Sequence, residues 1–265
     1  MIDNIILGMP TLIECKDLYD NVKICRELSL KFIEINMNLP QYQIGTIDKE
    51  QLKRISAKEN IFFTLHLDEN INVCDFNKEV AKAYIKTVLD SIKLAKELEI
   101  PILNMHMAEG VHFTLPDKKI YLFEEYKDKY LSDLRKFREM CTEAIGDSNI
   151  KLCIENTSGY KDFMIEGVKL LLESNVFALT WDIGHDHCTK EMDKNFIESN
   201  IERLVHMHFH DAKGSKDHLV LGTGDIDLNE KVSIAKNNNC RCVIESKIIE
   251  GLRKSVHFLE GDRHL

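Results

Sequence analysis

The chain has 265 residues, of which 44% are hydrophobic and 30% charged, and its formal net charge at pH 7 is −9. This balance suits one large soluble domain, and the negative charge disfavours a general nucleic-acid binder without excluding a locally basic cleft. No apolar run approaches the roughly 20 residues of a membrane helix. The N-terminus, MIDNIILGMP, lacks the basic flank and the cleavage site of a signal peptide. We therefore expect a cytoplasmic protein without a membrane partner.

Short β-rich runs alternate with amphipathic stretches from end to end. Strands are predicted at 4–9, 31–37, 62–67, 101–107, 150–157, 177–185, 204–211 and 240–246. Helices are predicted near 12–28, 48–59, 79–98, 121–145, 160–173, 191–203, 227–237 and 249–259. Eight such units in this length predict an α/β fold, a single (β/α)₈ TIM barrel over 1–265. The alternative is an open doubly wound sheet, but no G-x-G-x-x-G follows the first strand.

The eight cysteines are scattered, mostly inside apolar segments, and form no C-x-x-C pair. A chain this long rarely depends on a disulfide framework, so buried reduced thiols are expected. Cys240 and Cys242 share one face of the last predicted strand, where packing is favoured over metal binding.

Ionisable side chains gather at the C-terminal ends of the predicted strands, where the active sites of such barrels lie. Seven of the eight strands place a carboxylate or an imidazole there, and one more histidine follows the sixth. These residues are Glu34, His66, His106, Glu155, Asp182, His185, His208 and Glu245. Chance would scatter polar residues along the strands, so the clustering predicts a functional site at this mouth of the barrel.

The segment LVHMHFHD places His206, His208 and His210 at every second position of the seventh predicted strand. Strand alternation directs the three side chains to one side. His208 lies level with the other rim groups and is interpreted as a metal ligand. His206, one layer deeper, is interpreted as a hydrogen-bonded core imidazole. His210 lies at the mouth, where it could contact substrate or support another ligand.

Carboxylates that converge in one pocket repel one another unless they take up protons or bind a cation. We therefore predict a divalent-metal site made by Glu155, Asp182, His208 and Glu245. Its mixed oxygen and nitrogen donors suit Mn²⁺, Zn²⁺, Co²⁺ or Mg²⁺, with the first two favoured.

Other polar residues could surround this site. Four histidines could bind substrate oxygens or hold a second metal: His66, His106, His185 and His218. Lys216 and Lys247 could balance a phosphate or carboxylate of the substrate, a solvated surface position being the alternative for each. Together with Glu34 and His210, the two lysines form the candidate substrate-binding set.

The segments LCIENT, TWDIGH, HFHDAKG, DHLVLGTGDID and VIES, in this order, resemble motifs of the xylose-isomerase-like TIM-barrel superfamily. That superfamily contains sugar-phosphate isomerases, sugar epimerases, inosose-processing enzymes and endonuclease-IV-type apurinic endonucleases. The resemblance spans nearly the whole chain. For the ketose 3-epimerase branch it implies one Mn²⁺ or similar ion held by Glu155, Asp182, His208 and Glu245, with the two glutamates also moving the substrate's proton.

The endonuclease IV branch uses three zinc ions and a larger ligand set. Four histidines match members of that set: His66, His106, His185 and His218. The chain departs from the endonuclease pattern at Lys216, where the family has an aspartate two residues before the histidine. It also lacks the arginine-rich DNA-penetrating loop after the second strand, where it has NMNLPQYQIG.

The leading hypothesis is a metal-dependent isomerase or epimerase of a sugar or sugar phosphate, with proton transfer through a metal-stabilised enediolate. Glu155 or Glu245 would remove the carbon-bound proton and the other would return it. His185 or His106 could hydrogen-bond the developing oxyanion. The alternatives are an apurinic-endonuclease-type zinc phosphodiesterase, a lyase or dehydratase using the same metal site, and a non-catalytic barrel. The sequence leaves the substrate and a homo-oligomeric state open.

Overall fold

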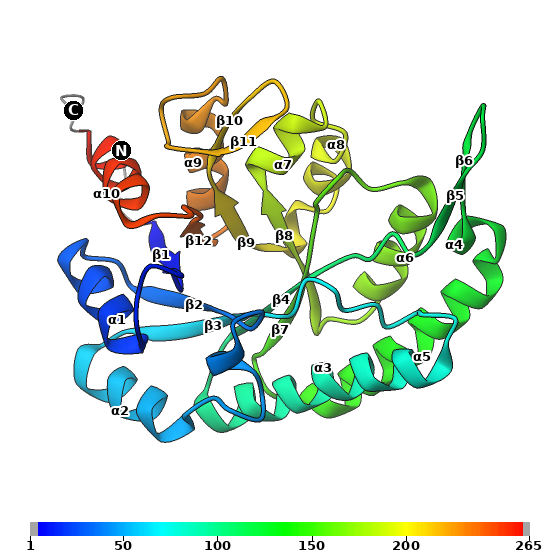
Figure 1. Cartoon of the computed structure of the whole chain (residues 1–265), viewed down its shortest axis with the longest axis horizontal. Helices are drawn as coiled ribbons and strands as arrows, with labels where there is room; N and C mark the ends of the chain where they lie inside the picture. Colours follow the sequence, from blue (N-terminus) through cyan, green and yellow to red (C-terminus); the bar gives the residue numbers. More distant parts are fainter. Residues whose placement is uncertain (1–4, 262–265) are drawn as a thin grey trace.

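Eight short apolar strands close into a parallel barrel in the computed structural model, which describes residues 5–261 (Figure 1). The strands are β1 (Ile6–Pro10), β2 (Phe32–Asn36), β3 (Phe62–His66), β4 (Ile102–His106), β7 (Lys151–Glu155), β8 (Phe177–Asp182), β9 (Leu204–Phe209) and β12 (Arg241–Ile244). Around the barrel their order is β1-β12-β9-β8-β7-β4-β3-β2. The predicted (β/α)₈ barrel is therefore confirmed. Asn4, where the first strand was predicted to begin, lies outside the described residues.

Helices surround the barrel and follow the predicted alternation. They are α1 (Leu18–Glu27), α2 (Lys49–Glu59), α3 (Lys78–Leu98), α4 (Leu122–Glu125), α5 (Lys127–Ile145), α6 (Asp162–Leu172), α7 (Ile183–Cys188), α8 (Lys194–Glu198), α9 (Leu228–Asn237) and α10 (Ile249–Glu260). The side chains of Asp17, Asp48, Asn77 and Asp227 accept backbone N–H groups and so fix the starts of α1, α2, α3 and α9. Within residues 5–261, no helix has the length and apolar character needed to span a bilayer.

Some element boundaries differ from the sequence prediction. Strand β8 ends at Asp182 rather than at 185, because the Asp182 carboxylate accepts the N–H of His185 at 2.7 Å and starts helix α7. The predicted helix 191–203 is instead the short α8 followed by a 3₁₀ turn at Ile201–Arg203. The predicted helix 121–145 is broken at Tyr126 into α4 and α5.

Two antiparallel hairpins were not predicted. One pairs β5 (His112–Thr114) with β6 (Lys119–Tyr121) and projects from the barrel after β4 (Figure 1). The other pairs β10 (Asp211–Lys213) with β11 (Lys216–Leu219), so the predicted strand 204–211 is divided after Phe209. All eight cysteines are free and seven are buried, as expected for packing residues.

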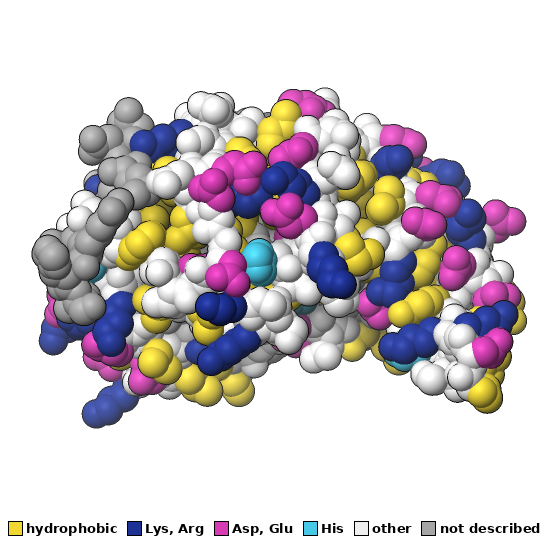
Figure 2. Space-filling model, turned by 90° about the horizontal axis from the view of Figure 1, so that it is seen from above, with side chains coloured by type: hydrophobic (Ala, Val, Ile, Leu, Met, Phe, Trp, Pro, Cys, Tyr) yellow, Lys and Arg dark blue, Asp and Glu magenta, His cyan; other side chains and the backbone are white. Residues whose placement is uncertain are grey.

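The parallel register brings the rim residues to one level. His106 pairs with Glu155 across β4 and β7, and Asp182 pairs with His208 across β8 and β9. Glu245 directly follows β12, and its N–H donates to the carbonyl of Phe209 at 2.9 Å. Figure 2 looks onto this end of the barrel, where a histidine side chain is visible between acidic and basic side chains.

Candidate metal centre

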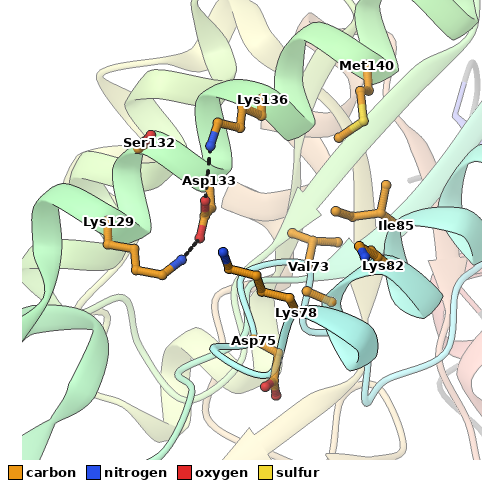
Figure 3. A pocket seen from close by; sticks show the side chains of 11 residues that line it. Val73, Asp75, Lys78, Lys82, Ile85, Lys129, Ser132, Asp133, Lys136 and Met140 are labelled. Carbon is orange, nitrogen blue, oxygen red and sulfur yellow. Dashed lines mark hydrogen bonds and ion pairs between the residues drawn. The ribbon is translucent and has the colours of Figure 1, made fainter.

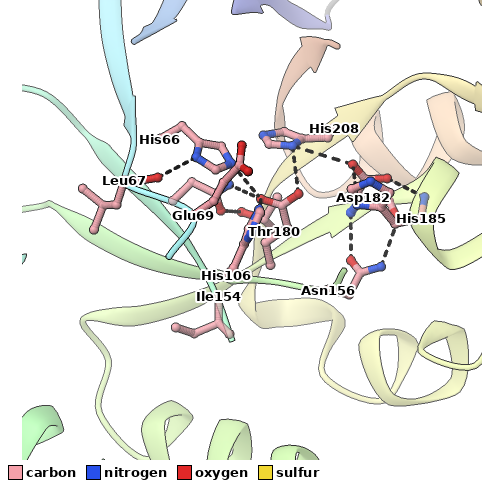
Figure 4. A network of polar contacts seen from close by, with 12 residues as sticks. His66, Leu67, Glu69, His106, Ile154, Asn156, Thr180, Asp182, His185 and His208 are labelled. Atoms are coloured by element: carbon pink, nitrogen blue, oxygen red, sulfur yellow. Dashed lines mark hydrogen bonds and ion pairs between the residues drawn. The ribbon is translucent and has the colours of Figure 1, made fainter. Parts of the chain in front are cut away.

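His208 lies at the centre of the barrel mouth and is 1% exposed. Its Nδ1 atom lies 3.1 Å from Glu155 Oε1, 3.4 Å from Glu245 Oε2 and 3.8 Å from Asp182 Oδ2. Neither this Nδ1 nor Glu245 Oε2 has a hydrogen-bond partner of good geometry among the described residues. Two buried carboxylates and the partly exposed Glu245 carboxylate, around one unsatisfied imidazole nitrogen, form a donor set that fits a divalent cation. The structure thus brings together the four residues predicted as ligands, of which Figure 4 labels His208 and Asp182.

Glu34 lies directly behind His208. Its Oε1 atom accepts a hydrogen bond from His208 Nε2 at 2.8 Å, while Oε2 accepts one from Thr64 Oγ1 at 2.9 Å and lies 3.2 Å from His206 Nε2. Burial raises the pKa of Glu34, but the imidazoles of His206 and His208 outweigh burial and lower it well below its usual range. When a metal ion displaces the proton on Nδ1, the ionised Glu34 would keep the other ring proton on Nε2 and so leave the Nδ1 lone pair for the cation.

A polar layer that the sequence reasoning missed lies beneath the rim. Thr180 Oγ1 donates to Asn104 Oδ1 at 2.6 Å, and Asn104 Nδ2 donates to Glu155 Oε2. His206 Nδ1 lies 3.1 Å from the same Thr180 hydroxyl, so His206 is the buried, hydrogen-bonded imidazole that was expected. Asn104 and Thr180 each precede a rim residue by two positions on their strands. That inward-facing parity was a signal available in the sequence.

His66 and His106 lie beside each other at the barrel mouth (Figure 4). Their Nε2 atoms lie 3.3 and 3.4 Å from Glu155 Oε2. Because His66 Nδ1 donates to the carbonyl of Leu67 at 2.9 Å, a neutral ring would aim its Nε2 lone pair at a carboxylate. Burial lowers the pKa of His66, but Glu155 outweighs it and raises the pKa to about 9. Either a proton on His66 or a second cation therefore balances the negative charge of Glu155.

Asp182 is held by His210. His210 Nε2 lies 2.9 Å from Asp182 Oδ1 and 3.0 Å from Oδ2, and its Nδ1 accepts the N–H of His218 at 2.8 Å. Because Nδ1 accepts an N–H, a proton of the ring lies on Nε2, where it faces Asp182. A Cβ atom at position 184 would lie 2.0 Å from the His210 ring, so the glycine there makes room for this support.

His185 and His218 also reach the centre. His185 Nδ1 lies 3.4 Å from Asp182 Oδ2, and His218 Nδ1 lies 3.7 Å from Glu245 Oε1. Neither Nδ1 has a hydrogen-bond partner of good geometry among the described residues. Asp217 Oδ2 lies 3.8 Å from His185 Nε2, so a carboxylate neighbours this pair of histidines although position 216 is a lysine.

The two lysines of the candidate substrate-binding set lie at different distances from the carboxylates. Lys247 Nζ lies 3.1 Å from Glu245 Oε1, with 63% of the lysine side chain exposed. Lys216 is exposed at the start of β11. Burial raises the pKa of Glu245, but His208, followed by His210 and Lys247, outweighs burial and lowers the pKa well below its usual range. Glu245 is therefore ionised at neutral pH.

Asp211 anchors the loop that follows β11. Its carboxylate accepts the N–H groups of Gly222 and Gly224 at 2.9 Å each, and of Ile226 at 3.3 Å. Asp211→Ala leaves these donors without the buried acceptor and should lower the free energy of unfolding by about 3 kcal/mol. Urea unfolding followed by circular dichroism measures this change.

Asp225→Ala is the matched control, because Asp225 is half-exposed and its nearest ammonium group, on Lys213, is 3.8 Å away. This substitution should change the free energy of unfolding by less than about 0.5 kcal/mol. Equal effects of the two substitutions would contradict the anchoring role of Asp211.

The fold and the mouth together define a (β/α)₈ barrel with a carboxylate- and imidazole-rich centre. The family model described as "Xylose isomerase-like TIM barrel" matches residues 22–260, and the chain belongs to this family. The superfamily expected from the sequence motifs is thereby confirmed.

Solved structures of similar proteins cover nearly the whole chain. A D-tagatose 3-epimerase-like protein aligns with a TM-score of 0.79 at 22% identity, over 97% of this chain and 96% of that one. D-psicose 3-epimerase from Clostridium cellulolyticum H10 aligns with a TM-score of 0.72 at 15% identity, over 97% and 98%. The IolI protein, in a structure with a bound zinc atom, aligns with a TM-score of 0.72 at 14% identity, over 97% of each chain. These likenesses establish the fold.

Proposed function

We propose that the protein is a divalent-metal-dependent isomerase or epimerase of a sugar or sugar phosphate. The observation that carries this proposal is the convergence of Glu155, Asp182 and Glu245 on the Nδ1 atom of His208. Sugar epimerases among the structural neighbours support the substrate class, and the zinc-bound neighbour supports a metal.

These four residues would hold the cation, Mn²⁺ or Zn²⁺ in preference to Co²⁺ or Mg²⁺. When bound, such an ion supplies Lewis-acid polarisation of a substrate carbonyl and lowers the pKa of the adjacent C–H. Glu34 and His210 support this arrangement from behind. We assign both residues positioning roles in place of the substrate contacts first expected, because their polar atoms are engaged by protein groups.

Glu155 and Glu245 differ in their freedom to accept a proton. Glu245 has 18% of its side chain exposed, whereas Glu155 is 1% exposed and its Oε2 atom already accepts from Asn104. We therefore assign Glu245 as the base that removes the carbon-bound proton. Glu155, on the other side of His208, would return a proton to the substrate carbon after receiving it from His66, whose Nε2 atom lies 3.3 Å from Glu155 Oε2. His106 and His185, each about one-fifth exposed, can donate hydrogen bonds to substrate oxygens.

The direct test uses a panel of ketopentoses, ketohexoses and their monophosphates. Conversion should require Mn²⁺ or Zn²⁺, disappear with a chelator and return when the metal is restored. Product analysis by chromatography separates aldose–ketose isomers from epimers, and it also detects the dehydration product expected of a lyase. Turnover that persists in metal-free protein would contradict the proposal.

Metal binding should release protons. Burial lowers the pKa of His208, but Glu155 and Glu34 outweigh it and raise the pKa well above 6.5, so the ring is protonated at pH 7 in the metal-free protein. A metal on Nδ1 must displace that proton, and affinity should rise about tenfold per pH unit between pH 6 and 8 for each proton displaced. Calorimetry in buffers of different ionisation enthalpy counts the protons, and a pH-independent affinity would argue against His208 as a ligand.

A zinc phosphodiesterase is the second candidate function. Two further clusters could each hold an additional ion. One consists of His66, Glu155 and His208, and the other of His185, His210 and His218. Against it, the segment NMNLPQYQIG after β2 contains no arginine. Incision of an abasic DNA duplex by zinc-loaded protein at low salt tests this alternative, and no incision would eliminate it.

A further inference from the structure

A cleft of about 420 Å³ lies in the helix layer, between α3 and α5 and away from the barrel mouth (Figure 3). Four lysines line it: Lys78, Lys82, Lys129 and Lys136. The cleft also contains Asp75 and Asp133, so its charged side chains leave a formal charge of +2 in a chain whose net charge is −9. A local excess of positive charge on an acidic protein favours an anionic ligand.

The ammonium groups of Lys78, Lys129 and Lys136 gather near Asp133 (Figure 3), whereas Lys82 pairs with Glu79 on its own helix at 2.8 Å. Asp133 pairs with Lys129 and, at 3.6 Å, with Lys136, which holds both lysines beside the opening (Figure 3). Lys78 also points toward Asp133 but forms no ion pair with another described residue. The Asp75 carboxylate points away from the lysines. Lys78 is therefore free to bind an anion that bridges it to the lysines of α5.

The remainder of the lining is apolar. Val73, which is 7% exposed, lies with Ile85 and Met140 beside the lysines. An inorganic ion would leave this surface uncovered, whereas the volume is in the range of small-molecule sites. An anion with a compact apolar body would fill both parts of the cleft.

We propose that this cleft binds an organic monophosphate, with the phosphate among Lys78, Lys129 and Lys136 and an apolar or planar body against Val73, Ile85 and Met140. The site does not depend on the function proposed for the barrel mouth. A mononucleotide and a phosphorylated aromatic molecule share this chemistry. Both consist of one phosphate joined to a body that buries apolar surface.

The cleft is physically connected to the candidate metal centre. Val73 and Asp75 belong to the segment that joins His66, at the end of β3, to α3. Val73 also lines a small inner cavity that His106 lines as well. A ligand in the cleft would therefore contact the segment that follows His66. It would also contact Val73, which lines the same small cavity as His106.

The test is calorimetric titration of metal-free protein with phenyl phosphate, and separately with inorganic phosphate. Phenyl phosphate should bind with a dissociation constant of about 1 mM or below, and more tightly than inorganic phosphate. Lys78→Ala should weaken phenyl phosphate binding at least about fivefold. Ile85→Ala should weaken phenyl phosphate binding but leave inorganic phosphate binding unchanged.

Lys86→Ala is the matched control, since Lys86 lies two turns beyond Lys78 on α3, pairs with Asp90 and does not line the cleft. It should change either affinity less than about twofold. Lys247→Ala, at the barrel mouth, tests the competing location. Three results would each overturn the proposal: no phenyl phosphate binding, an equal loss in Lys86→Ala, or a loss in Lys247→Ala alone. Unchanged circular dichroism and melting temperature confirm that each variant is folded.

Discussion

Glu245→Gln should lower the turnover number of the metal-loaded protein about 10³-fold on whichever sugar the panel identifies. Glu245 is the more exposed of the two candidate proton-transfer residues, and the amide cannot accept the carbon-bound proton. The amide still offers one oxygen to the cation, so the loss of turnover should persist at saturating metal. Steady-state kinetics with metal content measured on the same samples separates loss of the base from loss of the ion.

Glu250→Gln provides the matched control. Glu250 lies on α10, pairs with Lys254 at 3.4 Å and is 67% exposed, so its replacement should leave the turnover number within about twofold. Glu155→Gln should reduce turnover as well and should also weaken metal binding, because Glu155 Oε1 faces His208 Nδ1 at 3.1 Å. If the turnover number of Glu245→Gln is close to that of the unmodified protein, another residue must remove the carbon-bound proton.

The barrel and its four-residue centre could be predicted from the sequence because seven of the eight strands are largely apolar runs with a carboxylate or an imidazole near the C-terminal end. In a parallel barrel all such ends meet at one mouth, so the positions of Glu155, Asp182, His208 and Glu245 along the chain were sufficient to place them together. The two-residue spacing along the strand likewise placed His206 on the same side as His208 but one layer deeper.

The pairings inside the centre could not be predicted from the chain. Glu34 and His208 are 174 residues apart in sequence, and their 2.8 Å contact depends on side-chain conformations set by packing across the barrel. Glu34 therefore looked like a substrate contact.

The end of β8 was missed for a related reason: Asp182 is both a candidate ligand and the N-cap of α7, and only the second role stops the strand. The hairpins β5–β6 and β10–β11 are built from short strands, three or four residues each, whose patterns are too brief to distinguish from loops.

Glu34→Gln should weaken divalent-metal affinity about 10- to 100-fold while leaving the protein folded. The glutamine oxygen can still accept the His208 Nε2 hydrogen, so the ring keeps its orientation, but the negative charge that strengthens Nδ1 as a donor is lost. Calorimetric titration with Mn²⁺ and Zn²⁺ measures the change, and retained ring orientation can be checked by the histidine ¹⁵N shifts of the metal-free protein.

Thr64→Val separates charge from packing in this arrangement. It removes the 2.9 Å hydrogen bond from Thr64 Oγ1 to Glu34 Oε2 but keeps the carboxylate and the side-chain volume. We expect it to destabilise the fold by about 1 kcal/mol and to change metal affinity less than about fivefold. If Glu34→Gln binds metal as tightly as the unmodified protein does, Glu34 does not raise metal affinity through His208. The charge of Glu34 would then serve only the buried polar layer that it shares with His206. If Thr64→Val loses as much affinity as Glu34→Gln, the geometry of the layer, rather than its charge, determines how strongly the mouth binds a cation.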